Sequence, residues 1–562
     1  MGTLYYGDNL DILTRYIKDE SVDLVYLDPP FNSAQNYNAF FQEKDGAAAA
    51  SQIRAFEDTW TWNQESQRVY EELILQPGKV SEVMQAFKTF LGTNDMMAYL
   101  AMMSPRLVEL QRKLKPVGSL YLHCDPTASH YLKLLLDAVF GTNSFKNEIV
   151  WQRTNAHNMR TKGYVRANDI ILFYSKSDRF TFNEQYTEYG PEQMKRFKPD
   201  ETGRLYKAEN MTFSTRSPKR QFEWRGSKPP ANRSWGASLE QLEKWYAEGR
   251  ILLKKDGTPR LDGLKIYLDE TKGKPITTNW TDIERISNTS AERLGYPTQK
   301  PVALLERIIA TSSNPGDVVL DPFCGCGTTI DAAEKLGRKW VGIDVTPVAM
   351  TTIKKRLIDT YESTKKVRFL RASDAEARAG EPKSSEKELV VRIIGEPVTP
   401  ADAAKLAEDD KWAFEWWAVG LVGARGTKER KGADQGVDGQ ILFCDDPRSG
   451  KTEQIILQVK GGKTGSKDVR DLIGVLTREK AAIGVLISVQ EPTEPMKIEA
   501  TSAGFYEHKI NKLKYPRIQL RTVKELMEGK DIERPVNMAL DETFKKAPAS
   551  KKKNAEQTEL DV

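Results

Sequence analysis

One block of the chain, residues 317–345, does most to limit what it can fold into. It reads DVVLDPFCGCGTTIDAAEKLGRKWVGIDV, which is a strand, a glycine-rich turn, a helix and a second strand. The opening of the chain has the same alternation, with strand-like SVDLVYL, helical DMMAYLAMMSPRLVELQRKL and strand-like GSLYLHC. Alternating strands and helices imply a parallel, doubly wound sheet. The chain is therefore predicted to be an α/β protein.

Length and composition are those of an ordinary globular protein. The 562 residues suggest three or four domains, at roughly 100–200 residues each. Neither a membrane-length apolar run nor a signal peptide's basic-then-apolar start is found, so we expect no membrane partner and a cytoplasmic location. The four cysteines show no disulfide or zinc pattern, which fits a reducing compartment. The net charge of +5 permits a nucleic-acid partner without requiring one.

The glycine-rich turn predicts a nucleotide-like ligand. Asp321 ends a strand, Gly325 and Gly327 occupy the turn, and Thr328 opens the helix. Glycines at such a turn let the backbone approach a ligand closely. The next strand ends in Asp344, near the spacing at which an acid meets ribose hydroxyls. An adenosine-bearing cofactor is implied, although a glycine turn that simply closes a strand–helix unit stays open on these residues alone.

The chemistry of this turn favours a cationic cofactor. A pyrophosphate site usually needs a GxGxxG turn and an open helix N-terminus, whereas this turn carries Asp321 and the bulky Phe323. Such a turn better suits S-adenosylmethionine (AdoMet), which has an ammonium and a sulfonium group. The nearby Cys324 and Cys326 are interpreted as small turn residues rather than metal ligands. Three histidines are interpreted as structural or solvated: His123, His130 and His157.

A second unusual stretch, LDPPFNS at residues 27–33, follows a hydrophobic strand. Proline fixes φ and lacks an amide donor, so Pro29 and Pro30 hold a rigid loop that offers mainly acceptors. Asp28 adds a carboxylate and Phe31 an aromatic face. A flat ligand that donates hydrogen bonds would fit this loop, although a proline-terminated strand occurs in many α/β proteins.

Together, LDPPFNS and the later LDPFCGCGTT resemble the β-class order of the DNA amino-methyltransferases, over roughly residues 1–370. In that class the catalytic tetrapeptide comes first, then the target-recognition region, then the cofactor loop. YPTQKPVALLERIIATSSNPGDVVL, GSLYLHCD, NEIVWQR and DIILFYSK are similar to further segments of the family. The resemblance implies a Rossmann-like domain, AdoMet as cofactor and double-stranded DNA as substrate.

The resemblance also implies roles for the proline loop. Enzymes that modify a base's exocyclic amine flip the base out of the helix. The carboxylate of Asp28 and the carbonyl of Pro29 would accept the two amine hydrogens, Phe31 would stack on the base, and Pro30 would keep the loop rigid. Transfer then depends on positioning and electrostatics. Asp at position 28 indicates adenine N6, whereas cytosine-N4 enzymes more often have Ser there, and N4 is the alternative.

The cofactor residues follow in the same way. Asp8 resembles the residue near the cofactor adenine, and Thr298 and Lys300 lie in the family's cofactor-side segment, although Lys300 could be a solvated lysine. The predicted cofactor site comprises Asp8, Thr298, Lys300, Asp321, Phe323, Gly325, Gly327, Thr328 and Asp344.

The central stretch, including RSPKRQFEWRGSKPPANRSWG, is rich in basic and aromatic residues. Within a methyltransferase it would be the target-recognition region, with Arg and Lys on phosphates or guanine edges and Trp and Tyr as stacking surfaces. A solvated insertion is the alternative, and the flanking methyltransferase motifs favour DNA contact.

The C-terminal part carries a different set of polar residues. Glu415 is expected on a Trp-rich helix, Asp438 beside a strand, and Gln458 and Lys460 on one face of the next strand. Mg²⁺ on Asp438 and Gln458, with a lysine that orients water, suits phosphodiester hydrolysis. This part resembles the PD-(D/E)xK nucleases, most closely the Mrr-like restriction endonucleases, over about residues 400–530. Because an amide is a poorer Mg²⁺ ligand than a carboxylate, a non-catalytic DNA-binding domain is the alternative.

The resulting prediction is an adenine-N6 DNA methyltransferase fused to a Mg²⁺-dependent endonuclease, a type II-like restriction–modification enzyme. A homodimer and a separate restriction or specificity subunit are left open as partners, and a binding protein without transfer is a further alternative. The predicted parts are a methyltransferase catalytic part (1–150), a target-recognition region (151–295), an AdoMet-binding part (296–370), a linker (371–395), a restriction-endonuclease-like α/β domain (396–535) and a disordered tail (536–562).

Overall fold

The computed structural model describes most of the chain. The described residues are 2–30, 62–154, 163–215, 217–296, 298–372, 387–426, 436–446, 451–509, 512–535 and 547–549. They form two compact units, one of Met1–Asn183 with Thr278–Val562 and the other of Glu184–Thr277. The tail predicted over 536–562 lies outside the described residues, apart from 547–549.

The first unit is built on a ten-stranded sheet in the order β14-β4-β5-β3-β2-β15-β16-β1-β18-β17. Neighbouring strands are parallel except that β5 runs antiparallel to both β3 and β4. The predicted α/β architecture is therefore confirmed. The strands are β1 (Gly2–Tyr6), β2 (Val22–Leu27), β3 (Leu114–Cys124), β4 (Phe145–Gln152), β5 (Asn168–Ser175), β14 (Asn279–Trp280), β15 (Val318–Asp321), β16 (Lys339–Asp344), β17 (Lys366–Ala372) and β18 (Glu388–Ile394).

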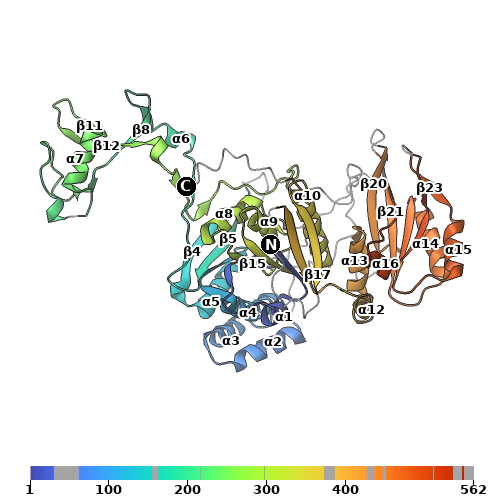
Figure 1. Ribbon diagram of the computed structural model, residues 1–562. Coiled ribbons are helices and arrows are strands. Elements are labelled where there is room, and N and C mark those ends of the chain that lie inside the picture. The colour runs from blue at the N-terminus through green and yellow to red at the C-terminus, as the bar shows by residue number, and fades with distance from the viewer. Residues whose placement is uncertain are drawn as a thin grey trace. The chain divides into compact units, whose positions relative to one another are not determined.

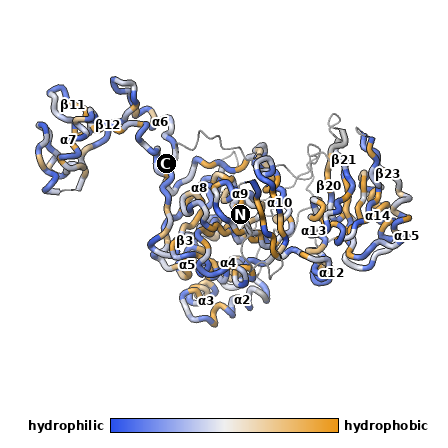
Figure 2. The backbone as a smooth tube through the Cα atoms, in the orientation of Figure 1, coloured by the Kyte–Doolittle hydropathy of each residue, from blue (hydrophilic) through white to orange (hydrophobic). Residues whose placement is uncertain are grey.

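Helices cover both sides of this sheet (Figure 1). All six residues of β2 are buried, as expected for a strand of a parallel sheet whose two faces are covered. Figure 2 shows hydrophobic residues concentrated along the strands of the sheet. The helices are α1 (Asn9–Arg15), α2 (Gln64–Leu75), α3 (Lys79–Leu91), α4 (Asp95–Lys113), α5 (Ser129–Phe140), α8 (Val302–Ser312), α9 (Thr328–Lys335) and α10 (Pro347–Tyr361).

The structure divides the chain differently from two of the predicted boundaries. The linker predicted over 371–395 contains β18, which pairs with β1 and β17 inside the large sheet. Its apolar residues are almost fully buried, so the polar composition of the preceding stretch, which lies largely outside the described residues, was a misleading boundary signal. β5 and β14, which fall within the target-recognition region predicted over 151–295, also belong to the large sheet, and the separate unit spans Glu184–Thr277.

The second unit has a small core of its own. A four-stranded sheet in the order β11-β12-β8-β7 packs with α7. Trp224 and Trp235 are 3% and 0% exposed within this core, so the prediction that they offer stacking surfaces is wrong. In a small unit with few aliphatic residues, large aromatic side chains supply most of the buried area. The elements are β6 (Tyr186–Thr187), α6 (Pro191–Met194), β7 (Lys198–Pro199), β8 (Leu205–Glu209), β9 (Thr212–Phe213), β10 (Ser234–Trp235), α7 (Leu239–Ala247), β11 (Ile251–Leu253), β12 (Pro259–Tyr267) and β13 (Lys274–Pro275).

The C-terminal part of the first unit is a separate five-stranded sheet in the order β19-β20-β21-β22-β25. The pairs β19–β20 and β20–β21 are antiparallel, and β21–β22 and β22–β25 are parallel. Two hydrophobic clusters form its core, one with α12, α13 and α16 and the other with α14 and α15. The elements are α12 (Pro400–Asp409), α13 (Lys411–Leu421), β19 (Arg425–Gly426), β20 (Gly439–Asp446), β21 (Lys451–Lys460), α14 (Ser466–Arg478), β22 (Ile483–Ser488), α15 (Glu494–Ser502), β23 (Phe505–Glu507), β24 (Lys514–Pro516), β25 (Ile518–Thr522) and α16 (Val523–Met527).

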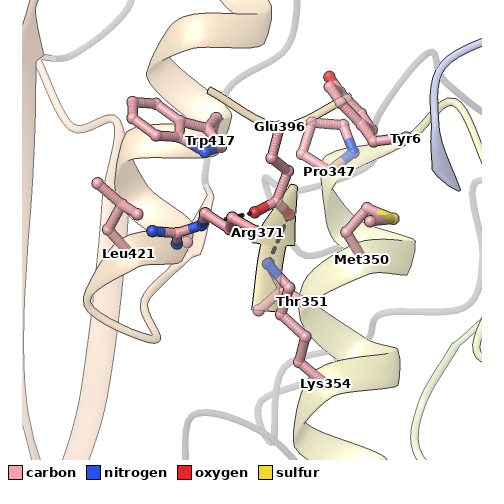
Figure 3. Close-up of a pocket in the computed structure, with 10 residues that line it drawn as sticks. Tyr6, Pro347, Met350, Thr351, Lys354, Arg371, Glu396, Trp417 and Leu421 are labelled. Atoms are coloured by element: carbon pink, nitrogen blue, oxygen red, sulfur yellow. Dashed lines mark hydrogen bonds and ion pairs between the residues drawn. The ribbon is translucent and has the colours of Figure 1, made fainter. Parts of the chain in front are cut away.

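Helix α13 packs against α10 of the large sheet, and a buried charge cluster lies at this contact (Figure 3). The Glu396 carboxylate pairs with Lys354 Nζ and, at 3.3 Å, with Arg371 Nε. Burial lowers the pKa of Lys354, and the negative charge of Glu396 acts in the opposite direction. Trp417 and Leu421 of α13 line the same small hollow. Among the described residues, no helix is long and apolar enough to cross a membrane.

Candidate functional site

A cavity of about 280 Å³ opens at the carboxyl ends of β1, β2, β15 and β16. Ligands of open α/β sheets bind at this edge, where the strand order reverses. Residues from three distant segments of the chain meet there, as the sequence predicted. The predicted residues that line the cavity are Asp8, Asp28, Pro29, Pro30, Thr298, Lys300, Asp321, Phe323, Gly325, Thr328 and Asp344. Phe31 lies outside the described residues.

The glycine turn has a conformation that requires glycine. Gly325 and Gly327 have φ of +48° and +76°, in the left-handed region that side chains disfavour. Gly327 directly precedes α9 and is not among the cavity-lining residues, and a Cβ there would lie 2.9 Å from Ile353 Cγ1. A Cβ on Gly325 would lie 3.2 Å from the ring of Tyr296, a cavity residue that the sequence did not single out. The turn therefore brings bare backbone to the cavity wall.

Asp344 organises this turn. Its Oδ2 accepts a hydrogen bond from the Gly325 amide at 2.9 Å. Its Oδ1 accepts from the amide and the hydroxyl of Thr346 at 2.8 and 2.7 Å. Burial raises the pKa of Asp344, and the hydrogen bonds oppose the shift. The carboxylate thus orders the loop that would contact a ribose.

Asp321 is a carboxyl group of the cavity with a strongly raised pKa. Burial raises its pKa to about 7, and the charges of Asp28 and Asp344 add to the shift. Hydrogen bonds from Thr329 Oγ1 at 2.5 Å and from the Phe323 amide at 3.0 Å act in the opposite direction. A cationic ligand would relieve the repulsion among these carboxylates. The three carboxylates therefore fit the ammonium and sulfonium groups of AdoMet.

Asp8 has a structural task at the cavity rim. Its Oδ1 accepts from the Leu10 amide at 2.9 Å and caps α1, and its Oδ2 pairs with Arg106 Nη2 at 2.7 Å. Arg106 Nε also donates to Asn9 Oδ1 at 2.5 Å, and Asn9 Nδ2 donates to the Pro322 carbonyl at 2.8 Å. This network joins the β1–α1 turn to the glycine turn. Arg106 itself could not be found from the sequence, because it is one of several basic residues on α4.

Asp28 and Lys300 form an ion pair inside the cavity. Lys300 Nζ contacts Asp28 Oδ2 and lies 3.5 Å from the Thr298 carbonyl. Lys300 is only 9% exposed, so the interpretation of a solvated lysine is wrong. Thr298 has φ of +60°, a strained conformation for a β-branched residue. The cavity therefore holds a buried cation against the carboxylate that the resemblance marks as catalytic.

In the C-terminal part, the predicted residues lie on the expected elements. Glu415 is buried on α13, Asp438 is buried just before β20, and Gln458 and Lys460 are on β21. Asp438 Oδ2 accepts from the Val459 amide at 2.6 Å, which places it beside β21. In the part of the chain that the structure describes, no three His, Cys, Asp or Glu side chains form a cluster that could hold a metal.

Gln458 is the unusual member of this set. Its Oε1 is buried and has no hydrogen-bond partner among the described residues. A buried amide oxygen without a partner costs free energy. An oxygen in this state fits a hard cation such as Mg²⁺, although it supplies no charge.

Comparisons with known proteins agree with the family that the cavity-lining motifs resemble. Residues 22–355, more than half of the chain, match the family model described as DNA methylase (N6_N4_Mtase). Residues 414–528 match the model described as NACHT-associated inactive Restriction Endonuclease 1, so an Mrr-like nuclease is not confirmed.

Individual relatives are all DNA-modifying enzymes by name. Type II methyltransferase M.EcaI of Enterobacter cloacae is 34% identical over 261 residues, 46% of this chain and 57% of the relative. The StyLTI Mod subunit, from a type III restriction-modification enzyme of Salmonella typhimurium, is 25% identical over 67% of this chain and 57% of its own length. DNA adenine methyltransferase YhdJ of Escherichia coli is 24% identical over 61% of this chain and 78% of its own length. The chain thus spans little more than half the length of the first two relatives.

Among solved structures, the M1.HpyAVI–SAM complex is 17% identical, with a TM-score of 0.30, and covers 64% of this chain and 100% of that one. The cytosine-N4-specific PvuII DNA methyltransferase is 15% identical, with a TM-score of 0.28, and covers 68% and 88%. The family assignment therefore depends on the extent of the sequence match, which includes the proline loop, the glycine turn and Lys300. The chain belongs to the DNA methylase family.

Proposed function

We propose that this chain transfers a methyl group from AdoMet to the N6 amine of adenine in double-stranded DNA. The observation that carries the proposal is the convergence of the Asp28–Pro30 loop with the Asp321–Thr328 turn on one cavity. A loop of acceptors beside an acidic, glycine-lined site is what a neutral amine acceptor and a cationic donor require. The name of YhdJ, an adenine methyltransferase, supports the choice of base.

The chain's own residues would act mainly by positioning. AdoMet, when bound, supplies the electrophilic methyl group. Asp28 and the Pro29 carbonyl would accept the amine hydrogens of a flipped adenine, which localises the nitrogen lone pair for in-line attack. Asp321 and Asp344 would hold the positive cofactor by charge and by the loop they order. Asp28 would then accept the proton that the methylated nitrogen releases.

The second unit is proposed as the target-recognition region. Between Glu184 and Thr277 the sequence has 19 Lys and Arg against 14 Asp and Glu, which equals the excess of +5 of the whole chain. Several arginines are engaged by acids, such as Arg204 with Asp269. Within the described part of the unit, only Lys195 and Lys207 among the lysines form ion pairs. The exposed lysines without one include Lys219, Lys228, Lys254 and Lys255, and we expect these to contact DNA phosphates.

Nucleoside mass spectrometry tests the main proposal directly. Plasmid DNA of varied sequence is incubated with the purified chain and AdoMet, with divalent metals chelated. We expect N6-methyladenine, lost in Asp28→Ala and retained in Asp11→Ala, a matched change of an exposed aspartate on α1. N4-methylcytosine would be compatible with the proposed mechanism but would show that the target base is cytosine. No methylated base, with AdoMet binding intact, would contradict transfer by this chain alone and point to a second subunit such as those that accompany Mod proteins.

As a second activity we propose Mg²⁺-dependent DNA cleavage by the C-terminal part. The observation that favours it is the buried Oε1 of Gln458, which has no hydrogen-bond partner among the described residues and lies on the strand next to Asp438. Lys460, on the same face of β21 as Gln458, would orient the attacking water. A non-catalytic DNA-binding domain is the competing function, which the description of the matched model as inactive favours.

Cleavage of unmodified plasmid with Mg²⁺, compared between the native chain and Lys460→Ala, separates these functions. Loss of cleavage in the variant supports a nuclease, whereas equal cleavage by both preparations, or none by either, supports the DNA-binding domain. If both activities act at one site, we expect self-methylated DNA to resist cleavage, and equal rates on both substrates would contradict this.

A further inference from the structure

A chain of three buried polar side chains runs behind the proline loop. Tyr26 is on β2, His123 on the adjacent β3 and Asp169 on β5. The Tyr26 hydroxyl lies 3.0 Å from His123 Nδ1, and His123 Nε2 lies 3.1 Å from Asp169 Oδ2. All three residues are at most 2% exposed. Burying polar groups costs free energy, and apolar side chains could fill the same space without that cost. The three polar residues therefore call for a functional explanation.

Asp169 determines which way the protons point. Burial would raise its pKa, but the hydrogen bond from His123 and the charges of Lys300 and Arg153 hold the pKa below its usual range. Asp169 is therefore an acceptor for the Nε2 proton. In a neutral imidazole the other nitrogen is an acceptor. His123 Nδ1 thus accepts the hydroxyl proton of Tyr26.

Tyr26 connects this chain to the reaction site. Tyr26 lines the same cavity as Asp28 and precedes Asp28 by two residues. Side chains two residues apart in an extended chain project to the same face of the sheet. The charge of Asp28 also contributes, after burial, to raising the pKa of Tyr26 well above its usual value. With its proton directed at His123, the Tyr26 oxygen keeps its lone pairs for a donor in the cavity.

We propose that His123 and Asp169 are positioning residues that keep the Tyr26 oxygen as an acceptor next to Asp28, where it helps to bind the target amine. This inference rests on the proposed transfer to a base amine and adds a third acceptor to Asp28 and Pro29. The sequence did not indicate this role, because His123 was interpreted as structural or solvated.

Arg153 makes the inference testable with an isosteric change. Its Nε lies 3.2 Å from Asp169 Oδ1. In Asp169→Asn, the amide oxygen stays towards this cation, so the amide NH₂ faces His123 Nε2. The imidazole then carries its proton on Nδ1 and donates to Tyr26, whose own proton turns towards the cavity. The variant therefore converts an acceptor into a donor without a change of shape.

The experiment compares the native chain, Asp169→Asn, Tyr26→Phe and the double variant. We expect kcat for DNA methylation to fall about tenfold to a hundredfold in Asp169→Asn and about tenfold in Tyr26→Phe, with AdoMet Kd unchanged. In the Tyr26→Phe background, Asp169→Asn should cost no further activity. A native kcat in Asp169→Asn, or the same fold-loss in both backgrounds, would overturn the inference.

A second readout does not depend on activity. Histidine ¹⁵N shifts report the tautomer, and the chain has only four histidines, so His123→Asn assigns the signal. We expect a protonated Nε2 in the native chain and a protonated Nδ1 in Asp169→Asn. An unchanged tautomer would contradict the inference even if a variant lost activity by misfolding. A native chain that methylates no base would instead refute the proposed function, with the tautomer result still standing.

Discussion

Lys300 places its ammonium group on Oδ2 of Asp28, within the cavity that the proline loop and the glycine turn share. The pair joins residues 272 positions apart in the sequence, and the two side chains are 10% and 15% exposed. An ammonium group donates hydrogen bonds as an amine does, so Lys300 occupies the acceptor that the target base needs. Target binding must therefore displace Lys300 or share the carboxylate with it.

Replacing Lys300 by Met should separate folding from catalysis. The change removes the cation that pairs with a mostly buried carboxylate, and breaking such a pair costs about 3–5 kcal/mol. We expect a lower midpoint in urea unfolding and a lower kcat. Asp28→Asn with Lys300→Met should restore stability without activity. Native stability in the single variant would show that the pair is not formed.

The raised pKa of Asp321 predicts how cofactor affinity depends on pH. With a pKa of about 7, Asp321 is largely protonated below neutrality, and a bound cation favours its ionised form. Binding then releases a proton, so AdoMet affinity should rise as pH increases towards 7 and level off above it, by at most about tenfold per pH unit. Calorimetry between pH 5.5 and 7.5 in buffers of different ionisation enthalpy measures both effects.

Asp321→Asn provides the control for this pH dependence. The amide cannot ionise, so affinity should be weaker at neutral pH and nearly constant over the same range. A slope that persists in the variant would assign the titration to another group, such as Asp344, whose pKa burial also raises.

Gly327 is predicted to be irreplaceable for two separable reasons. Gly327→Ala adds a Cβ at φ +76° and 2.9 Å from Ile353 Cγ1, whereas Gly337→Ala adds one at φ +71° with no atom within 4 Å. Strain alone should cost Gly337→Ala about 1–3 kcal/mol of unfolding free energy. Gly327→Ala should cost more and weaken AdoMet binding. Ile353→Ala, which removes Cγ1, should cost less in the Gly327→Ala background than in the native chain. Equal losses in the two single variants would show that the contact with Ile353 is unimportant.

Glu396 is expected to be essential for stability at the contact between α10 and α13. Its carboxylate compensates Lys354 and Arg371, and Glu396→Gln would leave two cations without that compensation. We expect a loss of about 3–5 kcal/mol, measured by chemical unfolding. Glu388→Gln, in the more exposed pair with Arg368, is the matched control and should cost less than about 1 kcal/mol. A similar loss in both would argue against a special role for the buried cluster.

The motifs were predictable from sequence because each is a backbone device with few alternatives. Two prolines after a strand, and glycines at φ above +40°, can be recognised from the residue types alone. Their position at one edge of the sheet follows from the parallel topology. The roles of Arg106 and Tyr26 could not be recognised in this way, because arginines on helices and tyrosines in buried strands are common. Trp224 and Trp235 misled because exposure depends on how much other apolar material a small unit contains. The strand β18 was missed because the polar stretch before it resembled a linker.

The last prediction concerns Gln458, whose buried Oε1 lacks a hydrogen-bond partner among the described residues. Gln458→Glu would place a carboxylate in the same position. Without metal, the charge should destabilise the chain, because a buried carboxylate without compensation costs several kcal/mol.

Mg²⁺ should reverse this cost in Gln458→Glu, since a carboxylate is a far better ligand than an amide. Thermal unfolding should therefore show a larger Mg²⁺-induced rise in Tm for this variant than for the native chain. Gln454→Glu, four residues earlier on β21, is the matched control and should show no such gain, because its side chain donates to the Glu479 carbonyl away from Asp438. Equal Mg²⁺ responses of both variants would place no metal site at Gln458, and the C-terminal part would then act on DNA by binding alone.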